Sequence, residues 1–364
     1  MRHLLTTIFI LISSTALASN LTQAADSLLG VLKNTQSPEQ RVQIYRNLAD
    51  IYSESPEART YLLKMYQEAS TINDRKSMLN ALDDILTTGI YDYNKDTIAK
   101  YTKLFEKIAT EEELKSLLPF YRMRTFDSRC YSGERDKAIK EEISSQNSKA
   151  NGKEDIYNQV VSAYNMGTSF YMSDQYAKAI PYLDKAMKLA ESLPEKDKYI
   201  YKKFITWRVC FTYGQTGKGK EAVKIMEQLI NMVEHKYRTD YQKQRPFYNI
   251  DPYLLQYYSF LISSLPYLTL EQEKTYWKRI QKIGKNLTND LDKYNYYLCA
   301  NNYYSNNHTE KDYYKAIAAN DSLIKFATTL APLNLPGLYN INSMTYEAVK
   351  DYQNALKYLK ISHQ

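Results

Sequence analysis

The sequence predicts an all-α protein, a solenoid of antiparallel helix hairpins. Gly and Pro number only 10 each among 364 residues, so the chain has few of the turn residues that a many-stranded fold uses. Within residues 163–190, Gly167 and Phe170 stand one turn apart before a polar break, and Ala179 and Leu183 follow at helical spacing. This pattern indicates two packed helices. Because such a hairpin buries one face of each helix and leaves the other for a neighbour, it implies copies on either side.

The first 18 residues predict a secretory signal peptide. Arg2 precedes an apolar run from Leu4 to Ile12, and small residues ending in Ala18 follow it. That run is shorter than the ~20 apolar residues of a membrane helix, and no later stretch reaches this length. No Cys follows the expected cleavage site, which disfavours the lipoprotein form of the signal. The mature chain is therefore expected to be exported to the periplasm or cell envelope and to lack a transmembrane segment.

The rest of the chain is expected to have two parts. Residues 19–150 read as divergent helical repeats, and residues 151–364 as a more regular helical array. The polar run from Ser144 to Gly152 is the most linker-like stretch and sets the boundary between them. Pro119 predicts a kink or an early restart inside one helix of the first part.

The charge pattern argues against a nucleic-acid partner. The formal net charge is +7, but the basic residues are interleaved with acids, as in residues 195–198. Such mixing is typical of a solvated helix face, whereas a nucleic-acid interface clusters Lys and Arg without compensating acids.

One motif imitates a phosphate-binding loop. Residues 214–220 satisfy the G-x-x-x-x-G-K part of that motif. However, Glu221 stands where the loop needs Ser or Thr for Mg²⁺, and the run follows a predicted helix rather than a strand. We therefore interpret it as the turn of a helix hairpin.

No catalytic, metal or cofactor site is indicated. The cysteines are odd in number, which excludes a full disulfide framework, and in a solenoid such distant residues are not expected to pair. The histidines lack metal-ligand spacing. We expect the cysteines to be buried apolar residues and assign no enzyme activity, although an enzyme with an unrecognised site stays an alternative. The residues concerned are Cys130, Cys210, Cys299, His3, His235, His308 and His363.

The hairpin at 163–190 resembles a tetratricopeptide repeat (TPR). That consensus has a small residue, an aromatic three residues later, an aromatic in the second helix and Ala at two further points. These places are filled in order by Gly167, Phe170, Tyr176, Ala179 and Ala186. A divergent copy runs over about 204–229, and a third holds Ser343, Tyr346, Tyr352 and Ala355 at the same offsets. The resemblance implies a right-handed superhelical array.

TPR arrays commonly present a concave groove made by the first helix of each hairpin. Here the resemblance places in that groove Tyr164, Thr168, Tyr171, Trp207, Phe211 and Gln215. An aromatic groove suits an extended or helical peptide segment. The alternative is that Trp207 and Phe211 pack between repeats.

The layout is similar to the exported N-terminal TPR region of bacterial envelope sensors and regulators. This resemblance implies a non-catalytic scaffold for protein interaction or sensing, which associates with a protein or peptide and feeds a membrane-bound regulator. Since the chain stops inside a hairpin, a longer natural protein is one expectation and a natural end at Gln364 the other. A glycan-capture protein of the outer envelope is the alternative function.

Overall fold

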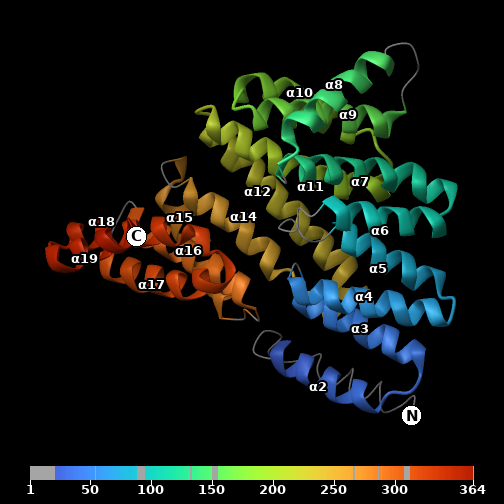
Figure 1. Ribbon diagram of the computed structural model, residues 1–364, viewed down its shortest axis with the longest axis horizontal. Helices are drawn as coiled ribbons and strands as arrows, with labels where there is room; N and C mark the ends of the chain where they lie inside the picture. The colour runs from blue at the N-terminus through green and yellow to red at the C-terminus, as the bar shows by residue number, and fades with distance from the viewer. Residues whose placement is uncertain are drawn as a thin grey trace. The chain divides into compact units, whose positions relative to one another are not determined.

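The computed structural model describes residues 21–53, 55–87, 95–131, 133–149, 155–264, 267–285, 287, 289–306 and 312–363. Within these ranges the regular structure is helical and no strand occurs, which confirms the all-α prediction. Successive helices pack against one another in pairs (Figure 1). The predicted signal peptide lies outside the described residues.

Up to residue 149 the helices are α2 (Leu21–Asn34), α3 (Pro38–Tyr52), α4 (Pro56–Thr71), α5 (Arg75–Thr87), α6 (Lys95–Ile108), α7 (Glu111–Tyr131) and α8 (Arg135–Lys149). Two sequence expectations are modified here. Helix α7 runs through Pro119 as one element, so the helix does not restart there, while the kink stays a prediction; α8 extends into the run that we expected to be a linker. Thr110 and Glu113 cap the start of α7 through reciprocal hydrogen bonds. Pro119 lies after the first two turns of this helix.

From residue 155 on the helices are α9 (Ile156–Met172), α10 (Tyr176–Ala190), α11 (Glu195–Gln215), α12 (Gly219–Lys236), α13 (Gln242–Gln244), α14 (Asp251–Ser263), α15 (Leu270–Gly284), α16 (Asp290–Asn306), α17 (Tyr313–Leu330), α18 (Leu335–Ala348) and α19 (Tyr352–Ser362). A π-helical turn, η1 (Tyr237–Tyr241), follows α12, and a 3-10 turn, η3 (Pro332–Asn334), precedes α18. None of the described helices is both long and apolar enough to cross a bilayer.

The chain divides into two compact units. The larger unit contains Thr35–Ala49 and Pro56–Pro246, and the other contains Met1–Asn34, Asp50–Ser55 and Phe247–Gln364. In the larger unit each helix from α4 to α12 packs against the next, and α7 and α11 also pack against α9. The contacts of α7 and α8 with α9 run across residue 150, where we expected a boundary; that boundary stays a prediction.

The hairpin of α9 and α10 is held together by close contact at Gly167. A Cβ added there would lie 2.6 Å from Leu183 Cγ, which is closer than real Cβ contacts. Ala179 and Ala186 are fully buried on the facing helix. The sequence prediction that these small residues serve packing is therefore confirmed, because only small side chains allow the two backbones to approach this far.

The other two TPR-like hairpins use the same places. Cys210 and Ala222 are fully buried between α11 and α12, whose turn contains Gly217 with a φ of +73°. In the smaller unit, Ser343 Oγ of α18 donates to the Ala355 carbonyl of α19 at 2.8 Å. All three cysteines are buried free thiols, as the sequence analysis expected.

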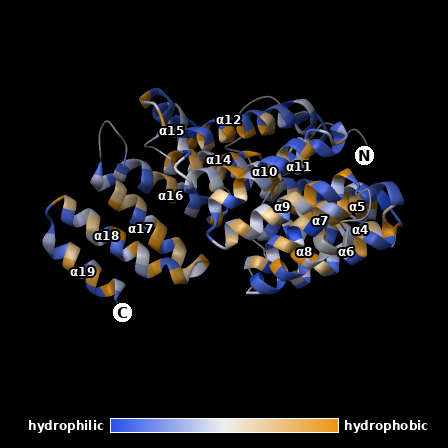
Figure 2. Ribbon diagram, turned by 90° about the horizontal axis from the view of Figure 1, so that it is seen from above, coloured by the Kyte–Doolittle hydropathy of each residue, from blue (hydrophilic) through white to orange (hydrophobic). Residues whose placement is uncertain are grey.

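The smaller unit carries most of its core between α14 and α18. Helix α17 packs against both α16 and α18, and the hydropathy colouring in Figure 2 shows apolar and polar residues alternating along these helices. Buried asparagines fasten the pairs: Asn301 Nδ2 donates to the Ala316 carbonyl at 3.1 Å, and Asn320 Nδ2 to the Leu338 carbonyl at 2.7 Å. Each bond satisfies a polar group that would otherwise be costly to bury.

Replacing Gly167 by Ala is expected to destabilise the protein by about 1–3 kcal/mol, because the new Cβ overpacks the contact with Leu183. Urea unfolding followed by circular dichroism measures the change. Gly214→Ala is the matched control: this helical glycine has nothing within 4 Å of an added Cβ, so the substitution should stabilise by about 0.5–1 kcal/mol. Equal effects of the two variants would contradict the close-contact assignment.

Candidate functional site

Two of the six predicted groove residues are buried. Tyr164 is 1% exposed and Thr168 is fully buried, so neither lines an open surface. The cause is that α11 packs its side chains over α9: the Tyr164 and Phe204 ring centroids lie 5.3 Å apart. Phe204 also packs against Phe120 of α7, at 5.4 Å, so aromatic side chains from three helices fill the expected groove at this level.

The other four predicted residues keep access to the surface. Trp207 and Phe211 are half-buried on α11 and their ring centroids lie 4.9 Å apart in an edge-to-face pair. Gln215 is exposed at the end of the same helix. Tyr171 of α9 is half-buried beneath the Arg208 guanidinium, whose carbon lies 4.7 Å from the ring centroid. The structure therefore places Trp207, Phe211 and Gln215 on one helix and leaves Tyr171 in a polar cluster.

That cluster is built around a buried ion pair between α7 and α11. Arg208 Nη2 donates to Asp127 Oδ2 at 3.1 Å, and both side chains are less than a tenth exposed. Tyr164 of α9 donates its hydroxyl proton to the same oxygen at 2.8 Å, and Arg208 Nη1 donates to the Tyr131 hydroxyl at 3.0 Å. Burial, reinforced by the Asp127 charge, raises the pKa of Tyr164 well above its usual value. The phenol therefore stays a neutral donor.

Sequence reasoning missed Asp127 and Arg208. They lie 81 residues apart, and neither stands at a consensus place of the repeat. The one available signal was a charged residue on the apolar face of an amphipathic helix, which is the face that packs into the protein interior. Two buried polar atoms of this cluster, Asp127 Oδ1 and Arg208 Nε, have no hydrogen-bond partner.

A second polar cluster joins α3, α5, α7 and the segment after α13. The Asp84 carboxylate forms ion pairs with Arg46 at 2.8 Å and with Arg245 at 3.1 Å. The neighbouring Asp83 accepts a hydrogen bond from the Tyr121 hydroxyl at 2.7 Å. Desolvation, together with the Asp84 charge, raises the pKa of Asp83 to about 6. Perturbed carboxyls occur at functional sites, but here every neighbour belongs to the helix packing.

A cleft lies between α7, α8 and α9. It has a volume of about 310 Å³ and an apolar floor of Phe126, Ala138 and Val161. Phe126 stands as far before Ala138 as Gly167 stands before Ala179. A large ring thus occupies the place that a tight hairpin gives to a small residue, and it packs in one buried cluster with Cys130 of α7 and Ala138 of α8.

The polar groups of this cleft are largely paired with one another. Arg129 forms ion pairs with Glu134 at 3.2 Å and with Glu141 at 2.7 Å. Asn165 Nδ2 donates to Glu142 at 2.9 Å, while Asn165 Oδ1 is buried without a partner. A single water suits such an oxygen, and the cleft shows no triad or nucleophile arrangement.

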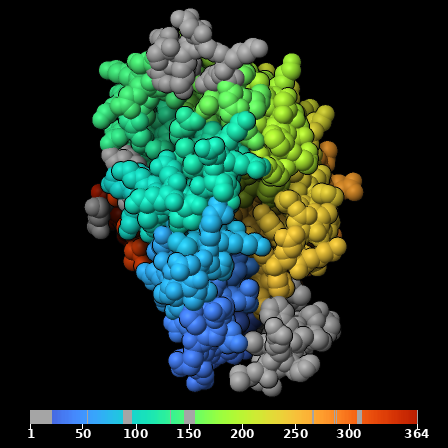
Figure 3. Space-filling model, turned by 90° about the vertical axis from the view of Figure 1, so that its right-hand side faces the viewer, coloured from blue at the N-terminus to red at the C-terminus, as the bar shows by residue number. Residues whose placement is uncertain are grey.

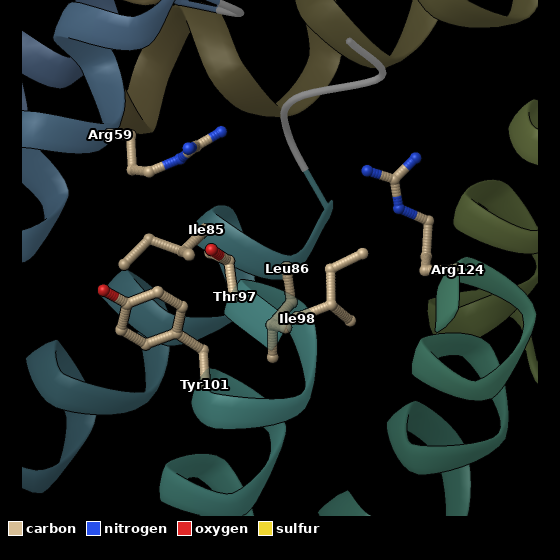
Figure 4. A pocket seen from close by; sticks show the side chains of 7 residues that line it. All are labelled: Arg59, Ile85, Leu86, Thr97, Ile98, Tyr101 and Arg124. Carbon is tan, nitrogen blue, oxygen red and sulfur yellow. The ribbon is translucent and has the colours of Figure 1, made fainter. Parts of the chain in front are cut away.

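A smaller pocket of about 10 Å³ lies among α4, α5, α6 and α7 (Figure 4). Arg59 and Arg124 extend over a floor that includes Ile85, Leu86 and Ile98. The Arg124 guanidinium lies 5.4 Å from the Phe204 ring centroid, so its charge already takes part in packing. In the space-filling view, side chains of α4 to α7 close the spaces between these helices (Figure 3). The pocket has room for about one water.

The remaining motifs keep their structural interpretation. Residues 214–220 span the end of α11, a turn and the start of α12, which confirms that the phosphate-loop look-alike is a hairpin turn. Among the described residues, no group of three or more His, Cys, Asp and Glu side chains is placed to hold a metal ion.

Comparison with known proteins adds no relative. A scan against models of protein families matches none of them to this chain, and a search of curated proteins finds no similar sequence.

Replacing Arg208 by Met is expected to cost about 3–5 kcal/mol of unfolding free energy, because the Asp127 carboxylate stays buried without its counter-charge. Urea unfolding measures the loss. The double variant Asp127→Asn/Arg208→Met should recover at least half of it, since no unpaired charge remains. If the losses of the single variants Arg208→Met and Asp127→Asn simply add in the double variant, the ion pair is not coupled as described.

The contribution of Asp83 to stability is expected to fall as pH rises from about 4 to about 6. The Asp83 pKa rises from 3.8 in the unfolded chain to about 6 in the folded one, so over this range only the folded state holds the proton. Asp83→Asn should remove this slope and raise stability at pH 7 by about 1–2 kcal/mol. Asp84→Asn, its neighbour, should instead lose stability because Arg46 and Arg245 lose their partner. Unfolding titrations at a series of pH values test both.

Proposed function

We propose that this chain is a non-catalytic scaffold for protein interaction or sensing in the bacterial cell envelope, built from TPR-like repeats in a right-handed superhelical array. The observation that carries the proposal is the recurring hairpin contact. Small residues stand at equivalent places of three hairpins: Gly167 meets the buried Leu183, Ser343 donates to the Ala355 carbonyl, and Cys210 is fully buried. Stacked hairpins of this kind are typical of proteins that bind other proteins along an extended surface.

The distribution of ionisable groups supports the non-catalytic part of the proposal. In the two polar clusters described, the charged side chains bind side chains of neighbouring helices and so hold these helices together. Asp127 is shared by Arg208 and Tyr164, and Asp84 by Arg46 and Arg245. These groups lie in the interior of a helix array and do not converge on a cleft with space for a substrate.

The surface that suits a partner is the Trp207 and Phe211 pair on α11, which we call the α11 aromatic pair. Both rings are half-buried, so each is positioned by packing and retains an exposed edge. Aromatic side chains of this kind supply large contact area at a low cost in conformational entropy and are enriched among the residues that dominate interfaces. Gln215, exposed at the end of the same helix, adds a polar group for an extended peptide backbone.

Replacing Trp207 and Phe211 together by Ala should weaken binding of the envelope partner at least about tenfold, because truncated aromatic anchors lose most of their contact energy. The partner is first identified by quantitative capture from an envelope extract. Its affinity for each purified variant is then measured by titration calorimetry.

The control is Tyr182→Ala on α10, which removes a partly exposed ring that packs on Phe170 of α9 and should leave affinity unchanged. Circular dichroism melts of all variants accompany the titrations. A loss of more than about 3 kcal/mol in the double variant would make the pair core residues and overturn this surface.

A further inference from the structure

Helix α15 presents a basic face. Five basic residues lie in this helix and at the residue that follows it, against two acids, of which Glu273 is fully buried. Four of the basic residues fall within about 80° of one another round the helix axis, because they are spaced by four, four and three residues. These four exposed side chains form a row about 16 Å long, which we call the α15 lysine row: Lys274, Lys278, Lys282 and Lys285.

The packing of α15 orients this row outward. The helix packs against α14 and α16 (Figure 1). Ile280 and Ile283, which lie on the side opposite the row, are buried. Lys282 interacts with the Asp251 carboxylate of α14, whereas the other three members of the row form no ion pair with a described residue. Most of the charge of the row is therefore available to a partner.

The row is an exception in a chain whose charges are mixed. On α12, Lys220 and Lys224 have the same four-residue spacing, but the exposed Glu221 stands between them. On α15 the one exposed acid is Glu271, which comes before the row begins. A concentration of like charge without acids among its members creates a local positive potential that attracts anions.

The shape of this surface and the type of its charges favour a lipid surface as the anion. The row lies on the outer side of a single helix, and neither the cleft nor the pocket described above includes a residue of α15. A membrane surface requires no groove. Lys is a strongly hydrated point charge, whereas Arg is favoured for bidentate recognition of one carboxylate or phosphate. Several lysines on an amphipathic helix are typical of binding to anionic lipids.

Apolar side chains stand at one end of the row. Tyr267, which precedes α15, is 40% exposed, and Leu270, the first residue of the helix, is 42% exposed. Leu270 comes four residues before Lys274, so the two lie within about 40° of each other round the helix axis. Helices that lie in the membrane–water interface combine basic side chains with aromatic and aliphatic ones in this way. An acidic polypeptide would match the lysines alone.

We propose that the α15 lysine row docks the protein on an anionic phospholipid surface, with the lysines against the phosphate groups and Leu270 at the level of the head groups. This goes beyond the proposed scaffold role and does not rest on it. The α11 aromatic pair belongs to the other compact unit, so the Trp207→Ala/Phe211→Ala variant should bind vesicles as the native chain does. Loss of vesicle binding and loss of peptide capture are therefore separate outcomes.

Sedimentation of lipid vesicles with the full chain tests the proposal. The vesicles contain phosphatidylcholine alone, or phosphatidylcholine with about a third phosphatidylglycerol. Partition onto the anionic vesicles should be at least about tenfold stronger at low salt, and the preference should shrink as salt rises because exposed charges are screened. Leu270→Ala should weaken binding about threefold at either salt concentration, since the insertion of an apolar side chain is not screened.

Removal of charge is the decisive comparison. Lys274→Gln/Lys278→Gln should weaken binding to the anionic vesicles at least about tenfold, since each lysine near such a surface contributes a factor of about five. The matched control, Lys220→Gln/Lys224→Gln on α12, changes the net charge by the same amount and should weaken binding less than about twofold. Both variants should keep the native melting temperature, because all four side chains are exposed.

Three results would overturn the proposal. Equal losses in the two double variants would show that binding follows net charge and not the α15 lysine row. Equal partition onto neutral and anionic vesicles would remove the role of the lysines. Absence of vesicle binding, together with binding of polyglutamate that Lys274→Gln/Lys278→Gln abolishes, would assign the row to an acidic protein instead.

Discussion

The ion pair between Asp127 and Arg208 is the constraint on which the centre of the larger unit depends. It joins α7 to α11 over the intervening α9, and Tyr164 of α9 donates to the same carboxylate oxygen. A buried charge is costly without its counter-charge, so this ion pair and the Tyr164 hydrogen bond constrain the relative positions of the three helices. The aromatic packing of Phe204 on Phe120 beside it fills the space that this alignment creates.

This arrangement explains which parts of the structure the sequence could predict. Hairpins were predictable because their close contacts are local: Gly167 meets Leu183, and Ser343 meets Ala355, within one pair of helices. The periodic spacing of small residues carries that information. The filling of the groove was not predictable, because it depends on Asp127 and Arg208, which lie 81 residues apart and stand at no repeat position. Tyr164 was therefore assigned to a surface that other helices cover.

The size of the residue at one position of the hairpin also differs between two hairpins of the larger unit. Gly167 lets α9 and α10 touch, whereas Phe126, at the equivalent distance before Ala138, lies in the floor of a cleft of about 310 Å³ between α7, α8 and α9. The sequence thus diverges from the repeat consensus at this place, while both α7 and α8 remain helical.

Packing prepares the proposed contact surface on α11, and this bears on what that surface can bind. Trp207 and Phe211 are half-buried and held by an edge-to-face contact, so a partner meets side chains whose rotamers are already restricted. Rings positioned in this way favour selective recognition of a peptide, because little conformational freedom is lost when a partner covers them.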